Sequence, residues 1–414
     1  MGAEKKKFPK IRFEGFSKDW GQEKLRTIFS FSKGKGYSKS SLVDDGNPIL
    51  LYGSLYTDYK SNIKNVKTYA YPLDKSIYST GDEVILPSSG ESDIDIARAS
   101  AVSQKGVLLG GDLNILKPKK SLNSVFMALN LTYSSINLSL IKRAQGQVVV
   151  HLYNSDIQNL KITIPEFLEQ TQIGNFFQKM DEVIELQQKR LALTQDYKKS
   201  MLQKMFPQKG EKVPRVRFGG FSGEWGTTYF KNIAKVRRGL TYSPSDVVTN
   251  QKGVRVLRSS NIDEDTLIVS DTDVFVRESA VKIDYIKMNE ILITAANGSS
   301  RLVGKHAIIN RDLQNTVHGG FMLAVSTSHP EFLNSWMNGA QYKKMLQLVQ
   351  GGNGAIGNLS RSMLEECKIT LPCLKEQTAI GNFFQKLDEK IEVESAKLEK
   401  LQVMKKAMLQ RMFV

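Results

Sequence analysis

The sequence predicts an α+β protein in which two globular domains with mixed, curved β-sheets are joined by two long coiled-coil helices. Two observations point to a pseudo-twofold internal repeat. Residues 170–206 recur as residues 377–413, with 22 of the 37 positions identical. A second motif near the start of the chain recurs about 205 residues later, so half of the chain is a copy of the other half.

The two recurring segments are predicted to be long helices. Their apolar residues step by four and then three, a 3.5-residue rhythm over about five heptads that is typical of a coiled-coil seam. The seam positions are Ile173, Phe177, Met180, Ile184, Leu191, Met201 and Met205 in the first copy, and Ile380, Phe384, Leu387, Ile391, Leu398, Leu401, Met408 and Met412 in the second.

Polar residues interrupt the seam at matching places in the two copies. Gln187 corresponds to Glu394, and Lys198 corresponds to Lys405. Matched polar interruptions can fix the register of a coiled coil and make the two helices prefer each other. The alternative is that each helix packs on its own domain.

The N-terminal segment of each half supplies the second motif. The pattern R-F-x-G-F-x-x-x-W begins at Arg12 and returns at Arg217. The repeated unit is therefore a leading segment, a variable globular body and a long helix. The predicted boundaries are 1–169 for the first domain, 170–206 for its helix, 207–214 for a proline-containing linker, 215–376 for the second domain and 377–414 for its helix.

The two globular bodies keep a skeleton of short apolar runs that follow turn residues, which predicts strands. Helices are expected at 123–131 and 330–349. Each body closes with a strand that runs into a proline, at 161–165 and 368–372, where the proline ends the strand. The other predicted strands lie at 46–51, 81–86, 110–116, 253–257, 289–293 and 319–325.

Composition limits the partners. The formal net charge is +16 and the pI is about 9.5, which favours a polyanion. The sequence has no run of 18 or more apolar residues that could span a bilayer. The N-terminus has no apolar stretch of a secretion signal, and Lys6 stands where a myristoylation motif has Ser or Thr. We therefore expect a cytoplasmic protein that binds nucleic acid and no membrane.

The sequence offers no recognisable catalytic or metal site. Cys367 and Cys373 are the only cysteines and form no disulfide framework or zinc motif. A Walker A loop, an Asp-rich cluster and an Asn-Pro-Pro-aromatic methylase signature are absent. The GxGxxG match at 352–357 follows a predicted helix rather than a strand, so it does not fit a dinucleotide fingerprint. The four histidines, 151, 306, 318 and 329, lack metal-ligand spacing and are expected at surface or capping positions.

Basic, amide and hydroxyl residues in the loops between strands are the candidate DNA-binding set. Arg and Lys bond guanine, Asn and Gln bond adenine, and Ser and Lys more often hold phosphate. The set recurs at corresponding places in both bodies. It comprises Lys33, Lys35, Tyr37, Lys39, Tyr52, Ser54, Ser88, Ser89, Arg98, Lys142, Arg143, Gln145 and Gln147 in the first body, and Arg237, Arg238, Tyr242, Arg258, Ser259, Ser260, Asn261, Asn297, Ser299, Ser300, Arg301, Lys305, Gln350 and Asn353 in the second.

The repeated motifs resemble those of a known family. The frame E-Q-x-x-I-G-x-F-F-x-K-x-D-x-x-I, which begins at Glu169 and again at Glu376, is similar to that of DNA-specificity subunits of type I restriction-modification systems. The leading motif and the half-chain repeat agree with this family over nearly the whole chain. The resemblance implies two target-recognition domains joined by two long antiparallel spacer helices.

The resemblance also implies the partners. Such a subunit binds double-stranded DNA, two methyltransferase subunits and restriction/translocase subunits, and has no active site itself. No cofactor is then expected in this chain, with S-adenosylmethionine, Mg²⁺ and ATP bound by partner subunits. Because the loops of the two bodies differ strongly, the expected DNA target is asymmetric and bipartite, with a gap set by the helices.

Two other functions remain open on the sequence. One is a self-sufficient restriction or methylation enzyme, which would transfer methyl groups unaided. The other is a coiled-coil DNA-binding regulator without a modification partner.

Overall fold

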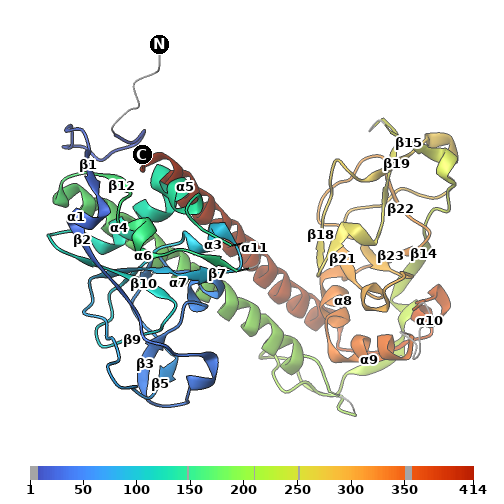
Figure 1. Cartoon of the computed structure of the whole chain (residues 1–414). Coiled ribbons are helices and arrows are strands. Elements are labelled where there is room, and N and C mark those ends of the chain that lie inside the picture. Colours follow the sequence, from blue (N-terminus) through green and yellow to red (C-terminus); the bar gives the residue numbers. More distant parts are fainter. Residues whose placement is uncertain (1–7, 147–148, 209, 250–251, 350–356) are drawn as a thin grey trace. The chain divides into compact units, whose positions relative to one another are not determined.

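The computed structural model describes residues 8–146, 149–208, 210–249, 252–349 and 357–414, in two compact units that we treat one at a time. The first unit takes the chain up to Lys189 together with Ala396–Val414, and the second takes Arg190–Ser395. The two 38-residue helices, α7 (Phe167–Lys204) and α11 (Leu374–Arg411), are therefore each divided between the units, with one end in the first unit and the other end in the second (Figure 1).

The first unit is built on a five-stranded sheet with the order β2-β10-β6-β8-β4. Its strands pair antiparallel except β4 and β8, which are parallel, and smaller pairings join β5-β3-β9, β11-β7 and β1-β12. The strands are β1 (Gly21–Lys24), β2 (Phe29–Lys33), β3 (Asn47–Leu50), β4 (Asn62–Ile63), β5 (Tyr69–Ala70), β6 (Glu83–Pro87), β7 (Ser89–Gly90), β8 (Ser100–Val102), β9 (Leu108–Leu109), β10 (Leu113–Pro118), β11 (Val150–His151) and β12 (Lys161–Ile164). The helices before α7 are α1 (Leu25–Ile28), α2 (Ser54–Thr57), α3 (Asp93–Ile96), α4 (Ser124–Tyr133), α5 (Ser135–Ile141) and α6 (Asn154–Ile157), with a 3₁₀ helix at Lys39–Ser41.

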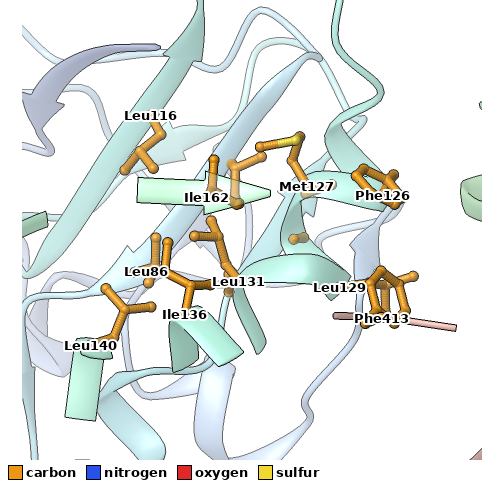
Figure 2. Close-up of a cluster of buried hydrophobic side chains, with 14 of the residues drawn as sticks. Leu86, Leu116, Phe126, Met127, Leu129, Leu131, Ile136, Leu140, Ile162 and Phe413 are labelled. Atoms are coloured by element: carbon orange, nitrogen blue, oxygen red, sulfur yellow. The ribbon is translucent and has the colours of Figure 1, made fainter. Parts of the chain in front are cut away.

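Strand β6 is buried on both faces, which explains its continuous apolar run in the sequence. Val84 and Leu86 join a cluster that includes α4 and α5, whereas Ile85 joins a second cluster on the opposite face. This division follows from the two-residue alternation of side chains along a strand. Figure 2 shows the first cluster, which contains both Leu129 of α4 and Phe413, a residue that follows α11.

The second unit repeats this topology. Its four-stranded sheet has the order β14-β23-β20-β21, and a second sheet has the order β15-β19-β16-β22. The strands are β13 (Gly226–Tyr229), β14 (Ala234–Arg238), β15 (Val247–Val248), β16 (Val254–Leu257), β17 (Ile262–Asp263), β18 (Thr266–Leu267), β19 (Val274–Val276), β20 (Ile291–Thr294), β21 (His306–Ile308), β22 (Thr316–His318), β23 (Met322–Thr327) and β24 (Lys368–Leu371). The helices before α11 are α8 (Pro330–Met337), α9 (Ala340–Val349) and α10 (Arg361–Glu365), with 3₁₀ helices at Phe230–Asn232, Pro244–Asp246, Ser259–Asn261, Glu278–Ala280 and Ser300–Leu302.

The two units share the central part of their topology. In each, the strand after the leading segment pairs with the strand that closes the body, β1 with β12 and β13 with β24. A short parallel pair recurs as β3 with β9 and as β16 with β22. The expected α+β class and the internal repeat are thus confirmed.

Equivalent glycines allow two strands to cross closely in each unit. A Cβ atom on Gly34, just after β2, would lie 1.8 Å from the carbonyl oxygen of Gly110. A Cβ atom on Gly239, just after β14, would lie 1.9 Å from the carbonyl oxygen of Gly319. Only glycine fits at such a distance, because backbone atoms cannot move aside as a flexible side chain can.

The recurring arginine and glutamate motifs form one clamp in each unit. The Arg12 guanidinium donates to both carboxylate oxygens of Glu169, at 2.6 and 2.7 Å, and Arg217 donates to Glu376 at 2.7 and 2.7 Å. Both glutamate side chains are 1% exposed and lie in the first turn of a long helix. A bidentate pair there also places negative charge at the positive end of the helix dipole.

The glutamines that follow these glutamates complete the helix start. Gln170 donates to the carbonyl oxygen of Pro165 at 2.9 Å, and Gln377 donates to that of Pro372 at 2.9 Å. The prolines end the preceding strands, and the glutamines hold each turn to the helix. The predicted helices therefore begin three residues earlier than the repeat suggested, at Phe167 and Leu374.

In each unit the two long helices run antiparallel. In the first unit Phe177 of α7 lies 5.9 Å, centroid to centroid, from Phe413, and Asp181 pairs with Lys405. In the second unit, residues further along α7 meet earlier residues of α11: Lys198 pairs with Asp388 at 2.5 Å. The expected antiparallel helices are present.

Each domain core is completed by the helix end of the other repeat. Met412 and Phe413 close the first cluster, where Phe413 lies 5.6 Å from Phe126. Phe206, the residue equivalent to Phe413, closes the core of the second unit. The start of each helix therefore packs on its own domain, as in the alternative drawn from the sequence, whereas its end packs on the domain of the other repeat, which the sequence did not predict.

The predicted apolar seam lies on the less exposed side of each long helix. All fifteen predicted apolar seam residues, seven from the first copy and eight from the second, are buried or half-buried. Glu394 is 4% exposed and accepts hydrogen bonds from Arg190 at 2.8 Å and from Thr194 at 3.0 Å. The interruptions are thus hydrogen-bonded inside the structure, as buried polar groups require.

The helix expected at 330–349 is instead two helices, α8 and α9. Asn338 and Gly339 separate them, and the Gly339 N–H donates to the carbonyl oxygen of Trp336. Glycine is the usual residue where a helix ends, so the break has a local cause.

Candidate nucleic-acid interface

In the first unit, the predicted residues around Gly34 lie where β2 leaves the main sheet. Lys33 is exposed and lies over the ring of Tyr153, with 5.3 Å between Nζ and the ring centroid. Lys35 is half-buried and forms a bridge to Gly110. This crossing therefore presents two lysines on a rigid backbone.

Tyr37 is held more firmly than a free loop residue. Its hydroxyl group lies 2.5 Å from the Ser76 hydroxyl group and accepts from the N–H of Leu73 at 3.0 Å. Its ring packs on the cluster that contains Leu108. The Tyr37 side chain thus orders the adjoining loop.

Arg98 is also partly engaged in the first unit. It pairs with Asp95 at 3.4 Å and lies 5.8 Å from the ring centroid of Tyr59. Ser88 is only 2% exposed and Ser54 donates to the Leu51 carbonyl oxygen at 2.6 Å, so both hydroxyls face the protein.

In the second unit, three predicted residues come together beside the equivalent crossing. Asn297 donates to the Ser259 hydroxyl group at 2.9 Å, and its own carbonyl oxygen accepts from the N–H of Ser299. Arg258 is exposed, and a Cβ atom on Gly319 would lie 3.8 Å from its Cγ. Arginine, serine and asparagine thus share one surface at the end of the sheet.

Two of the predicted residues hold this domain together. The Arg237 guanidinium donates to both oxygens of Glu290, at 2.8 and 2.6 Å, and Ser326 adds a third bond at 2.7 Å. Burial raises the pKa of Glu290, but these donors lower it by more, so the net shift is downward. Asn261 is 3% exposed and donates to Asp273 and to the carbonyl oxygen of Ile268. A DNA contact by Arg237 or Asn261 would require breaking these bonds.

The predicted DNA-binding residues differ in their exposure to solvent. The exposed members are Lys33, Lys39, Tyr52, Lys142, Arg143, Gln145, Arg238, Arg258, Ser260, Ser299 and Arg301. The half-buried members are Lys35, Tyr37, Ser54, Ser89, Arg98, Arg237, Tyr242, Ser259, Asn297, Ser300 and Lys305. Gln147, Gln350 and Asn353, with most of the GxGxxG segment, lie outside the described residues.

One exposed aromatic residue, Phe321, was not among the residues predicted from the sequence, although its backbone bonds to the residues just before Asn297. Phe321 is 73% exposed and follows the two glycines at the crossing. Its carbonyl oxygen accepts from the N–H groups of Ala295 and Ala296, at 2.8 and 3.1 Å, which fixes its backbone. The Gly-Gly-Phe run before a strand was the available signal, since two glycines there imply a close backbone approach.

Two of the four histidines correct the expectation of surface or capping positions. His306 and His318 are buried. Burial lowers the pKa of His318 to about 4, and burial also lowers the pKa of His306. His318 Nε2 lies 3.3 Å from the carbonyl oxygen of Arg237, so it belongs to the packed interior of the second domain.

Other classes of site have little support in the described part of the chain. No group of three or more His, Cys, Asp or Glu side chains there could hold a metal ion. Cys367 and Cys373 are free thiols. None of the helices described is, by itself, long and apolar enough to cross a membrane; the bent pair of α4 and α5 meets the criteria of length and composition only, and α4 is largely buried in the core.

Comparison with known protein families identifies the family of the chain. The type I restriction modification DNA specificity domain matches it twice, at residues 17–195 and at residues 223–403. The chain belongs to this family. Each match of the specificity domain runs from the leading segment into the long helix, so the two matches correspond to the two repeats.

Relatives of the specificity-domain family align along nearly the full chain. The type I restriction enzyme MjaVIII specificity subunit of Methanocaldococcus jannaschii is 21% identical over 401 residues, which is 94% of this chain and 91% of that protein. The solved S subunit of a type I restriction-modification system from M. genitalium aligns with a TM-score of 0.63 and 16% identity, and covers 98% of this chain and 99% of its own.

A chain from the structural study of complex assembly and conformational transition in the type I R-M system aligns with a TM-score of 0.53 and 13% identity. It covers 95% of this chain and 97% of its own. At these identities the structural matches show a shared fold. This protein is thus a type I specificity subunit by family, with two specificity domains of common topology.

Proposed function

We propose that this chain selects the DNA sequence for type I methylation and restriction by reading an asymmetric, bipartite target, one half-site with each domain. The observation that carries this proposal is that the two domains share their topology but differ in their loops. Beside the equivalent glycines Gly34 and Gly239, Lys33 and Lys35 of the first domain correspond to Arg238 and Leu240 of the second. After the equivalent strands β3 and β16, Leu51 corresponds to Arg258. Unlike side chains on like frames should read unlike base sequences.

The chain would act without catalysis of its own. The methyltransferase and restriction/translocase subunits would then supply S-adenosylmethionine, Mg²⁺ and ATP chemistry, and the complex would work in the cytoplasm. Purified alone with DNA and S-adenosylmethionine, the chain should transfer no methyl groups, whereas addition of two methyltransferase subunits should give methylation. Methyl transfer by the chain alone would instead favour the self-sufficient enzyme.

The long helices are proposed to set the gap between the half-sites. Each helix has 38 residues, or roughly 57 Å at about 1.5 Å per residue. Inserting one heptad into both helices keeps the seam in register and should lengthen the unread gap. An unchanged gap in the methylated motif would contradict this role for the helices.

Sequencing of methylated bases in cells with and without this gene tests the central proposal. A bipartite methylated motif should disappear with the gene. Arg258→Ala and Arg301→Ala should weaken binding or relax the second half-site only, while Lys282→Ala, an exposed charge outside the predicted loops, should leave the motif unchanged. If neither arginine substitution alters the methylated motif, the two loops that carry Arg258 and Arg301 do not read DNA.

A further inference from the structure

One lysine connects both long helices to a hairpin of the second domain. The Lys198 ammonium on α7 lies 2.5 Å from Asp388 of α11 and 2.7 Å from Asp265, in the turn between β17 and β18. The lysine side chain is only 14% exposed. Burial lowers the pKa of Lys198, but the two carboxylates raise it by more, so the lysine stays charged.

The hairpin is in turn tied to the segment that carries Arg258. We name residues 258–261 the second reading loop. Within it, the Arg258 N–H donates to the Asn261 side chain at 2.8 Å. The Asn261 amide also donates, at 2.9 Å, to the carbonyl oxygen of Ile268, just after β18. Few bonds therefore separate the helix pair from the reading loop.

The first unit has the equivalent connection, made with different chemistry. Lys405 and Asp181 are the counterparts of Lys198 and Asp388, and they form an ion pair. The second oxygen of Asp181 accepts from the Ser61 hydroxyl group at 2.8 Å. Ser61 is 3% exposed and ends residues 52–61, which we name the first reading loop.

We propose that these two lysine–aspartate pairs are positioning residues, which fix each reading loop to its own segment of the helix pair. The inference rests on the proposed function, and it goes further by naming the side chains that hold each loop in place. The same helix carboxylate–lysine pair meets a domain in both repeats, although the domain side uses Asp265 in one and Ser61 in the other.

The physical consequence is restricted movement of the loops. A charge-assisted hydrogen bond at a half-buried site is stronger and more directional than one exposed to water. With the lysine–aspartate pair and its contact to the domain (together the anchor) intact, the loop cannot shift to follow a half-site that is offset by one base pair. Without the anchor, the loop can shift, so half-sites at a wrong separation become acceptable.

Asp265→Ala tests this without removing the bond between the two helices. Asp263→Ala is the matched control, because Asp263 is exposed and its substitution also removes one carboxylate from the same hairpin. The complete complex with its methyltransferase subunits is incubated with DNA in which the gap is native or changed by one base pair. We expect Asp265→Ala to raise methylation at the changed gaps, relative to the native gap, about tenfold, as for the loss of one charged hydrogen bond of about 1.4 kcal/mol.

The outcomes separate the anchor from the function. A ratio equal to that of wild type and Asp263→Ala, or an equal loss of methylation at every gap, would overturn the inference while the proposed function stands. A wild type with no preference among gaps would overturn both. Asp265→Asn, which keeps the side-chain volume, replaces the alanine variant if that variant does not fold, and Ser61→Ala should relax the gap independently from the first unit.

Discussion

Truncation of Phe413 to alanine should destabilise the first domain, although the residue lies at the far end of the second repeat. Phe413 is 7% exposed and packs 5.6 Å from Phe126 and 5.9 Å from Phe177. Removal of a buried phenylalanine ring typically costs about 3–5 kcal/mol. Because Phe413 keeps 7% of its surface exposed and is not fully buried, we expect a loss near the lower limit, about 3 kcal/mol.

Hydrogen exchange measured by mass spectrometry can locate this loss. A loss of about 3 kcal/mol should speed amide exchange of β6 and β10 about a hundredfold, while β20 and β23 keep their rates. Phe206→Ala is the reciprocal variant, since Phe206 packs 6.0 Å from Trp225 in the second core, and it should have the opposite pattern. Exchange that is faster in β20 and β23 after Phe413→Ala would show that each helix end packs on its own domain.

A surface control excludes a general effect of shortening side chains on α11. Val403 is 62% exposed on the same helix, and Val403→Ala should leave exchange unchanged in both domains. Substitutions at such positions usually change stability by less than about 0.5 kcal/mol.

Three further changes test the frame. Gly239→Ala should lower the free energy of unfolding of the second domain by about 2–3 kcal/mol in thermal or denaturant unfolding, because its Cβ would lie 1.9 Å from the Gly319 carbonyl oxygen. Gly219→Ala is the control and should change it little, because a Cβ there has no atom within 4 Å. Lowering the pH from 6.5 to 4 should weaken the second domain by about 3 kcal/mol through His318, whose pKa is about 4 in the folded state and about 6.5 in the unfolded state. Over this range the unfolded state binds a proton at this histidine that the folded state resists, so stability falls with pH. His318→Gln should flatten this pH dependence of unfolding. Glu169→Gln should destabilise the first domain by about 3 kcal/mol in the same measurement, because it leaves a mostly buried arginine without its carboxylate, and equal stability of wild type and variant would show that the clamp is not needed.

Much of the frame could be predicted from the sequence because its signals are local or repeated. Heptad spacing gave both long helices, and apolar runs after turn residues gave the main strands, β6 and β20 among them. The motif glutamates Glu169 and Glu376 were recognised as a pattern. Their pairing with Arg12 and Arg217 was not, since a partner about 160 residues away leaves no trace in spacing.

The candidate site was harder to predict, because exposure depends on three-dimensional neighbours. Arg237 and Arg238 are adjacent and chemically identical, yet Arg237 is paired with Glu290 while Arg238 is exposed. Side chains of neighbouring strand residues point to opposite faces, and the sequence does not say which face holds a carboxylate. The buried histidines were missed for the same reason, since burial of His318 follows from packing of β22.

The division of labour within each domain explains how unlike loops can share one frame. The residues that recur between the halves, such as Phe177 with Phe384 and Phe206 with Phe413, lie in the cores that the long helices complete. The reading loops instead adjoin separate clusters on the other face of the sheet, where Leu55 and Ile262 are buried. Since a sheet buried on both faces holds the two layers apart, substitutions in the loops leave the helix-facing core intact. Each domain can therefore change the DNA bases that it reads while the reciprocal packing of the two helix ends stays the same.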